Sequence, residues 1–248
     1  MNALLDELLS TLFPRPCPLC RKVILHEQEG FCAACLEGFQ VIQEPVCSVC
    51  GYPLKGRTEP EGPLCPGCIS KNTPLPPLYT VRSIALYTGN VRRAILAVKY
   101  GRQAPVAHSL SVFARDHLTR FFPLSGFDRL VPVPLHPKRL RAREFNQCVL
   151  LARPLAVRLG IQLDLDAVER VRHTLPQSAS TEKERRKNLK GAFRVRKVPR
   201  IEGQSILVFD DVYTTGATLD ALAHCLLSAG ASRVAALTLA RSPGPNTS

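Results

Sequence analysis

Residues 206–218 combine the residue types of a sugar-phosphate site: Ile-Leu-Val-Phe-Asp-Asp-Val-Tyr-Thr-Thr-Gly-Ala-Thr. The first four are apolar, which is typical of a strand buried on both faces. Asp210 and Asp211 follow this strand and could accept hydrogen bonds from sugar hydroxyls. The Thr-rich segment after them leads into a helix, whose free N–H groups and positive dipole end bind phosphate. The run predicts a ribose-phosphate site; the alternative is a strand-to-helix turn capped by Thr218.

Eight of the ten cysteines form four Cys-x-x-Cys pairs within residues 1–78. Two residues between cysteines let both thiolates reach one ion, and two pairs complete the tetrahedral four-thiolate site that Zn²⁺ prefers. We expect two zinc sites, both structural, because four thiolates leave no open position for a substrate. The predicted ligands are Cys17, Cys20, Cys32, Cys35, Cys47, Cys50, Cys65 and Cys68.

The four pairs can share two ions in more than one way. Sequential pairing, first with second and third with fourth, needs no chain crossing and is favoured. An interleaved cross-brace is the alternative. Redox chemistry, the other common use of Cys-x-x-Cys, is disfavoured because no thioredoxin-like βαβ frame surrounds the pairs.

Composition divides the chain into two unlike parts. Residues 1–78 are rich in Cys and Pro and carry a net charge of −2, whereas residues 79–248 carry +15. A short Pro-rich segment cannot rely on a hydrophobic core, so metal must stabilise it. We predict an N-terminal helix and a double zinc ribbon over residues 1–73, and a second domain over residues 79–242. Residues 72–77 have the composition of a linker.

The charge of the first part also limits its partners. Zinc-bound thiolates make the ribbon more negative, which favours packing or protein docking over binding to a phosphate backbone. No apolar run approaches the ~20 residues of a membrane span. Asp6 and Glu7 interrupt the N-terminal apolar stretch, so it does not resemble a signal peptide. We expect a cytoplasmic protein without membrane insertion, in which cysteines do not form structural disulfides.

In the second part, helical and strand patterns alternate, which indicates an α/β fold with a parallel sheet. Ligands of such sheets bind beyond the carboxyl ends of the strands. The helices are predicted over residues 91–99, 104–122, 146–159 and 219–228. The strands are predicted over residues 128–133, 163–168, 205–209 and 233–239.

Residues 206–218 resemble the phosphoribosyl diphosphate (PRPP) signature of type I phosphoribosyltransferases at all thirteen positions. Other motifs resemble the ComF family, in which a zinc ribbon precedes a type I phosphoribosyltransferase domain linked to DNA uptake in natural transformation. One departure is Glu144, where the family usually has Gly before Phe-Asn-Gln. The matching segments are residues 131–139 (Val-Pro-Val-Pro-Leu-His-Pro-Lys-Arg), 145–147, 170–177, 184–188 and 191–193.

The resemblance implies a type I phosphoribosyltransferase fold with Asp210 and Asp211 on the ribose hydroxyls, as catalytic residues. It places a diphosphate loop after the strand at 131–134 and a mobile hood over residues 170–193. Arg and Lys of these segments, with Mg²⁺, would counter the diphosphate charge. The implied PRPP-binding residues are Tyr213, Thr214, Thr215, Gly216, Ala217 and Thr218 for the 5-phosphate, and Lys138, Arg139, Arg172 and Arg185 for the diphosphate.

We therefore expect transfer of a phosphoribosyl group from PRPP to an acceptor, linked to DNA uptake. The alternative is a non-catalytic PRPP sensor that binds single-stranded DNA or a partner in the DNA-uptake machinery. The net charge of +15 on residues 79–248 favours a nucleic-acid surface, but the absence of Trp argues against a stacking platform for single strands.

Overall fold

The computed structural model describes residues 15–24, 29–54, 64–70, 79–101, 103–118, 126–173 and 188–244. Several sequence predictions lie outside these ranges. They are the N-terminal helix, the linker at 72–77, the end of the helix at 119–122, and the basic residue Arg185.

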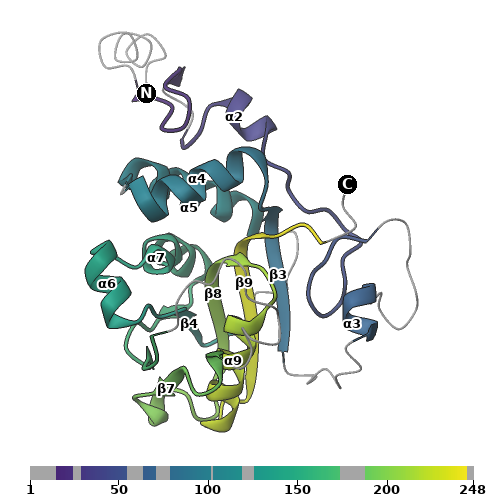
Figure 1. Ribbon diagram of the computed structural model, residues 1–248, viewed down its shortest axis with the longest axis vertical. Helices are drawn as coiled ribbons and strands as arrows, with labels where there is room; N and C mark the ends of the chain where they lie inside the picture. Colours follow the sequence, from purple (N-terminus) through teal and green to yellow (C-terminus); the bar gives the residue numbers. More distant parts are fainter. Residues whose placement is uncertain are drawn as a thin grey trace.

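A five-stranded sheet forms the centre of the molecule (Figure 1), and every neighbouring pair of its strands is parallel. The predicted α/β fold with a parallel sheet is confirmed. In spatial order the strands are β3 (Tyr79–Leu86), β9 (Arg233–Arg241), β8 (Ser205–Tyr213), β4 (Arg129–Pro132) and β5 (Gln162–Leu163).

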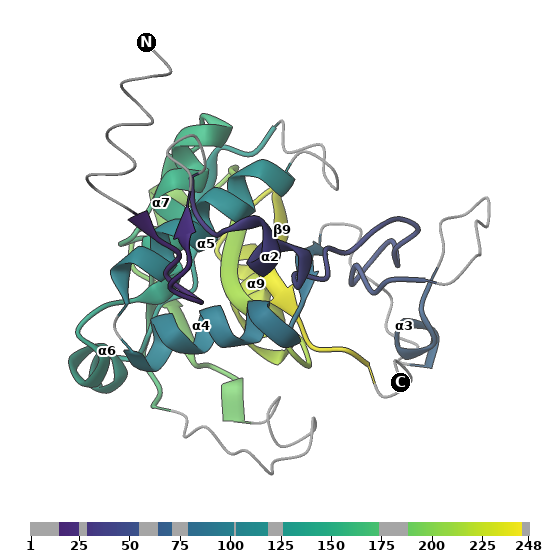
Figure 2. The same ribbon diagram turned by 90° about the horizontal axis from the view of Figure 1, so that it is seen from above.

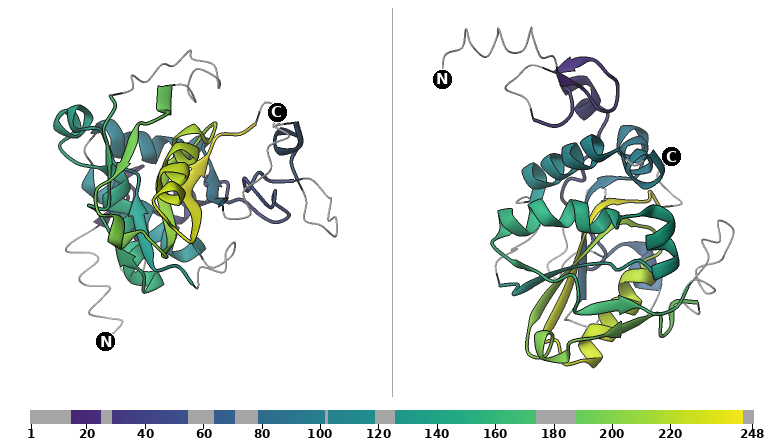
Figure 3. Two further views of the ribbon diagram at one scale, coloured as in Figure 1. Left: turned by 90° about the horizontal axis from the view of Figure 1, so that it is seen from below. Right: turned by 90° about the vertical axis from the view of Figure 1, so that its left-hand side faces the viewer.

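Helices cover both faces of the sheet, so each central strand is buried on both sides. The helices over residues 89–101, 104–117 and 147–159 lie on one face, and the helix over residues 217–228, α9, lies on the other (Figure 1 and Figure 3). Two hydrophobic cores result, one on each face of the sheet. Along β8, Leu207 and Phe209 belong to the core beneath the three helices, whereas Ile206 and Val208 belong to the core beneath α9. This alternation explains the continuous apolar run that precedes the two aspartates. The helices are α4 (Gly89–Gly101), α5 (Ala104–His117), α7 (Gln147–Leu159) and α9 (Ala217–Ser228).

The strand predicted over residues 163–168 is wrong. Asp164 is buried, and its carboxylate accepts hydrogen bonds from the backbone N–H groups of Asp166 and Ala167 at 3.1 and 2.9 Å. This turn ends β5 at Leu163 and redirects the chain into a second, antiparallel pair of strands. That pair is β6 (Val168–Arg170) and β7 (Phe193–Val195), followed by the 3₁₀ helix η2 (Val198–Arg200).

The first cysteine-rich segment, which contains the four cysteines from Cys17 to Cys35, packs on the helices α4 and α5 (Figure 2 and Figure 3). The ring of Phe39 contacts Phe113 of α5 edge to face, with centroids 4.7 Å apart. The backbone N–H of Ile42 donates to the Ile84 carbonyl of β3 at 2.9 Å. The segment therefore shares the core beneath α4 and α5. Its elements are β1 (Arg15–Pro16), β2 (Val23–Ile24) and α2 (Ala33–Glu37).

The second cysteine-rich segment lies on another side of the molecule, beside β3, where it includes α3 (Pro66–Ser70) (Figure 1). Within the described ranges, no helix has the length and apolar character needed to cross a membrane.

Candidate functional site

The acidic pair lies within a strand rather than after it. β8 continues to Tyr213, beyond the predicted end at Phe209, because it stays paired with β9 as far as Arg241. Its other neighbour, β4, stays in register only to the pair Pro132–Phe209. Asp210 and Asp211 therefore lie where the sheet opens at the carboxyl ends of its strands, the usual place for a ligand.

Asp211 is buried, and two side chains from the covering helices hold its carboxylate. Lys99 Nζ, near the end of α4, lies 2.7 Å from Asp211 Oδ2. Gln147 Nε2, at the start of α7, donates to the same oxygen at 3.2 Å. Burial lowers the pKa of Lys99, but the Asp211 carboxylate outweighs it and raises that pKa overall. Lys99 is therefore a buried counter-ion for the Asp211 carboxylate.

Asp210 has a different environment, although it is the next residue. It is half-buried, and its Oδ1 accepts hydrogen bonds from the Cys148 thiol at 3.3 Å and from the Asp211 backbone N–H at 2.8 Å. Burial, and then the neighbouring Asp211 charge, raises the pKa of Asp210 to about 7. Asp210 thus ionises less readily than an ordinary aspartate, and such raised carboxyl pKa values are common at functional sites.

Sequence reasoning did not assign Lys99, Gln147 or Cys148 to the site. Cys148 is buried, and its thiol donates to Asp210. Gln147 belongs to the Phe-Asn-Gln motif, which was a usable signal. Lys99 stands at the end of a predicted helix, and only the packing of α4 against β8 brings it to Asp211.

The predicted phosphate loop connects β8 to α9. Gly216 has φ +82° and is the N-cap of α9, a left-handed conformation that favours glycine. A Cβ atom at this position would lie 2.6 Å from Tyr213 Oη. The alternative prediction, that Thr218 caps the helix, is wrong, because α9 begins at Ala217 and Thr218 lies inside its first turn. The first N–H groups of α9 therefore face the loop.

The segment expected to be a diphosphate loop instead contains a short helix, α6 (Pro137–Arg143), which carries Lys138 and Arg139. Pro137 suits the first helical position, and the His136 side chain accepts from the Lys138 backbone N–H at 3.2 Å. Glu144 ends the helix at φ +69°, in the left-handed region. That conformation explains why glycine is the residue expected at this position.

The hairpin of β6 and β7 carries the second group of basic candidates. Arg172 follows β6 and donates to the Lys190 carbonyl at 2.8 Å. The rings of His136 and His173 have centroids 5.1 Å apart, which brings the start of α6 beside the end of β6. Two of the predicted basic segments thus come together, whereas Arg185 lies outside the described residues.

A pocket of about 480 Å³ lies between α6, the start of α7 and β6. Its walls are mostly apolar, with Leu140 and Phe145 among them. The charged residues that line it are Arg153, Glu169, Arg170 and Arg196.

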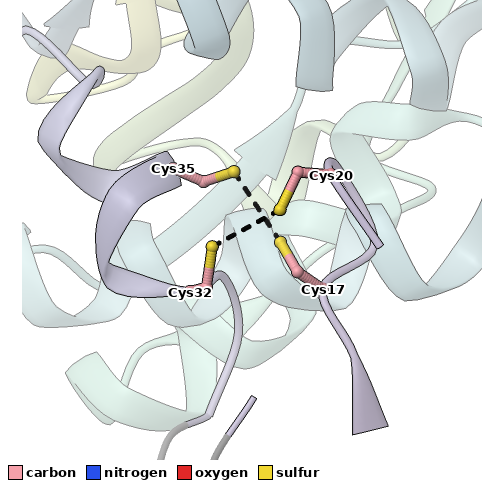
Figure 4. A group of neighbouring side chains, drawn as sticks. All are labelled: Cys17, Cys20, Cys32 and Cys35. Atoms are coloured by element: carbon pink, nitrogen blue, oxygen red, sulfur yellow. Dashed lines mark hydrogen bonds between the residues drawn. The ribbon is translucent and has the colours of Figure 1, made fainter. Parts of the chain in front are cut away.

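The eight cysteines form two tetrads. The first contains Cys17, Cys20, Cys32 and Cys35 (Figure 4), and the second contains Cys47, Cys50, Cys65 and Cys68.

Sequential pairing is confirmed by this grouping, and the interleaved alternative is wrong. Within each tetrad the sulfur atoms lie within 4.8 Å of one another. The Sγ separations are 3.8 Å for Cys17–Cys35, 3.5 Å for Cys20–Cys32 and 3.6 Å for Cys50–Cys65. Four thiolates at about 2.3 Å from a central Zn²⁺ stand about 3.8 Å apart, so both tetrads fit structural zinc.

Comparison with known proteins gives two domain families and several full-length relatives. Residues 8–69 match the double zinc ribbon domain, and residues 146–246 match the phosphoribosyl transferase domain. DNA utilization protein YhgH of Escherichia coli K12 is 34% identical, over 92% of this chain and 97% of its own. Competence protein F of Haemophilus influenzae is 29% identical, over 91% and 96%.

Among solved structures, the purine phosphoribosyltransferase of Pyrococcus horikoshii aligns with a TM-score of 0.29 and 17% identity, over 64% of this chain and 77% of that one. The full-length relatives, the two domain families and the paired cysteine tetrads lead to one assignment. The chain belongs to the ComF family, in which a double zinc ribbon precedes a phosphoribosyltransferase domain.

Proposed function

We propose that the domain over residues 79–242 binds PRPP with Mg²⁺ and transfers its phosphoribosyl group to an acceptor in a process linked to DNA uptake. The observation that carries this proposal is the junction of β8 and α9. There, two carboxyl groups stand at the open end of the sheet, and a left-handed glycine exposes a helix N-terminus directly beyond them.

The 5-phosphate would bind residues 213–218. The N–H groups at the start of α9 and the positive end of the helix dipole attract a phosphate. Thr214, Thr215 and Thr218 add hydroxyl donors, and Gly216 lets the backbone approach the anion.

The ribose hydroxyls would bind Asp210 in preference to Asp211. Asp211 Oδ2 already accepts from Lys99 and Gln147, whereas Asp210 is half-buried at the strand end. Cleavage of the bond between the anomeric carbon and diphosphate builds positive charge on the ribose. A carboxylate fixed beside the ring stabilises that charge, so Asp210 both positions the sugar and favours its transition state.

The diphosphate would lie toward α6 and the β6–β7 hairpin, where Lys138, Arg139 and Arg172 supply positive charge. Arg185, outside the described residues, is proposed as a further ligand. Mg²⁺ bound with the diphosphate would neutralise part of the charge on the leaving group. The carboxyl oxygens of Asp210 and Asp211 offer the hard ligands that Mg²⁺ takes.

Calorimetry with PRPP and Mg²⁺ tests the proposal. We expect the unaltered chain to bind, and Asp210→Asn to bind more weakly by about 1.5–3 kcal/mol, the usual value of a hydrogen bond to a charged group. Asp166→Asn, at an exposed carboxylate, is the matched control and should bind normally. Release of diphosphate on adding candidate acceptors reports turnover; an unaltered chain that shows no PRPP binding contradicts the proposal.

A second candidate function is binding of single-stranded DNA with PRPP as a regulatory ligand. The net charge of +15 on residues 79–248 favours it, as does the name "DNA utilization protein" carried by relatives. It predicts PRPP binding without diphosphate release, and DNA affinity that falls steeply as salt is added.

A further inference from the structure

The second zinc centre directly adjoins the phosphate loop. The side chain of Tyr213, the last residue of β8, packs against the cluster formed by Cys47, Cys50 and Cys65. The same Tyr213 carries the hydroxyl that lies 2.6 Å from where a Gly216 Cβ would be. One aromatic side chain therefore contacts both the turn that holds Cys47 and Cys50, here called the zinc knuckle, and the N-cap of α9.

Arg241, the last residue of β9, lies between these two parts. It is 5% exposed, and its Nη1 donates to the Cys50 carbonyl at 2.7 Å and lies 3.8 Å from Cys50 Sγ. Its guanidinium stands 4.9 Å from the ring centroid of Tyr52 and 5.0 Å from that of Tyr213. A buried cation beside a zinc-bound thiolate and between two rings is held by charge, hydrogen bonding and ring contact together.

Backbone hydrogen bonds fix the same knuckle to the sheet. The Val81 N–H of β3 donates to the Val49 carbonyl at 2.8 Å. A separate hydrogen bond, from the Ser242 N–H to the Tyr213 carbonyl at 2.8 Å, joins the residue after β9 to the end of β8. The second tetrad is therefore held near the start of β3 through Val49, and against the carboxyl ends of β9 and β8 through Arg241 and Tyr213. The first tetrad lies against α4, where Asn90 donates to the Cys35 carbonyl at 3.1 Å.

We propose that Arg241 is a positioning residue through which the second zinc ion holds Tyr213 and the phosphate loop in place. Binding of the 5-phosphate then depends on the second zinc site and not on the first. The inference rests on the proposed function, because it assigns the 5-phosphate to this loop. Its physical basis is the cost of a buried guanidinium that loses its acceptor when the knuckle of Cys47 and Cys50 opens.

Two matched pairs of variants test this dependence. Cys68→Ser removes the least buried ligand of the second tetrad, and Cys20→Ser removes the least buried ligand of the first. Arg241→Met removes the hydrogen bond to the Cys50 carbonyl and the cation that lies over the Tyr213 ring, while all four cysteines of the tetrad remain. Arg233→Met, at the opposite end of β9, removes an arginine that also lies over a ring, that of Phe127 at 4.0 Å.

The measurements are PRPP and ribose 5-phosphate affinity, zinc content, and backbone amide exchange of residues 213–219 in the unliganded chain. We expect Cys68→Ser and Arg241→Met to lower the affinity for both ligands by about tenfold or more and to speed amide exchange in the loop. Cys20→Ser and Arg233→Met should change neither the affinity nor the exchange. Arg241→Met should keep the zinc content of the unaltered chain. Arg241→Lys, which retains a donor for the Cys50 carbonyl, should restore part of the affinity.

Equal affinity of Cys68→Ser and Arg241→Met with the unaltered chain overturns the inference, and so does equal weakening by all four variants. Failure of the unaltered chain to bind PRPP or ribose 5-phosphate overturns the proposed function instead. The amide exchange then tests whether the second zinc site holds the loop through Arg241. Faster exchange of residues 213–219 in Cys68→Ser and Arg241→Met supports this connection, and unchanged exchange overturns it.

Discussion

At the scale of single residues, the ion pair of Lys99 and Asp211 links the helical layer to the site. Both side chains are largely removed from water, and their charged atoms are 2.7 Å apart. Lys99→Met leaves a buried carboxylate without its cation, so we expect a loss of about 3–5 kcal/mol in the free energy of unfolding. Chemical denaturation measures this loss.

The double variant Lys99→Met with Asp211→Asn provides the control, because it removes the uncompensated charge as well. It should recover much of the stability that Lys99→Met loses. Strictly additive losses in the two single variants would show that the pair does not act as a unit.

The carboxyl group of Asp210 should make stability depend on pH. Burial, and then the Asp211 charge, raises its pKa to about 7, above the ordinary 3.8, so the folded chain holds a proton that the unfolded chain releases between these values. The free energy of unfolding therefore falls as pH rises through this range. Asp210→Asn removes the effect, and its melting temperature relative to the unaltered chain should be higher at pH 8 than at pH 5.

Asp166→Asn is the control for this series. Its melting temperature relative to the unaltered chain should not show the same rise between the two pH values. If the difference between Asp210→Asn and the unaltered chain were the same at pH 5 and pH 8, the raised pKa of Asp210 would be refuted.

At the scale of elements, the end of α6 is strained by one side chain. Glu144 adopts φ +69°, where a non-glycine residue costs about 1–2 kcal/mol. Glu144→Gly should therefore raise the free energy of unfolding by about 1 kcal/mol. Arg141→Gly, inside the same helix, should instead lower it by about 0.5–1 kcal/mol. Thermal unfolding of the two variants would contradict this account if both lost stability.

The sequence predicts elements well where the signal is local. The apolar run, the glycine and the hydroxyl residues of 206–218 predict the strand, loop and helix that form around the site. The role of Asp164 in ending β5 was not predicted, because a single carboxylate leaves no periodic pattern in the sequence. Lys99 was missed for a different reason, since its contact with Asp211 exists only once α4 packs on β8.

At the scale of the whole molecule, the two zinc ribbons occupy different positions although both are built from two Cys-x-x-Cys pairs. The first tetrad packs on α4 and α5 and contributes to their core. The second stands at the carboxyl ends of β8 and β9, beside the proposed 5-phosphate site. Sequence spacing predicts the tetrads because ligand geometry is local. Their docking depends on contacts such as Phe39 with Phe113 and Arg241 with Cys50, which join residues far apart in the chain.

The central claim, that PRPP binds at the junction of β8 and α9, is tested most directly by the backbone amide exchange of the full chain with and without saturating PRPP and Mg²⁺. The account predicts slower exchange in residues 213–219, and the same protection of this loop by ribose 5-phosphate, with added protection around α6 and β6 for PRPP alone. Binding of PRPP with unchanged exchange in residues 213–219 would contradict it.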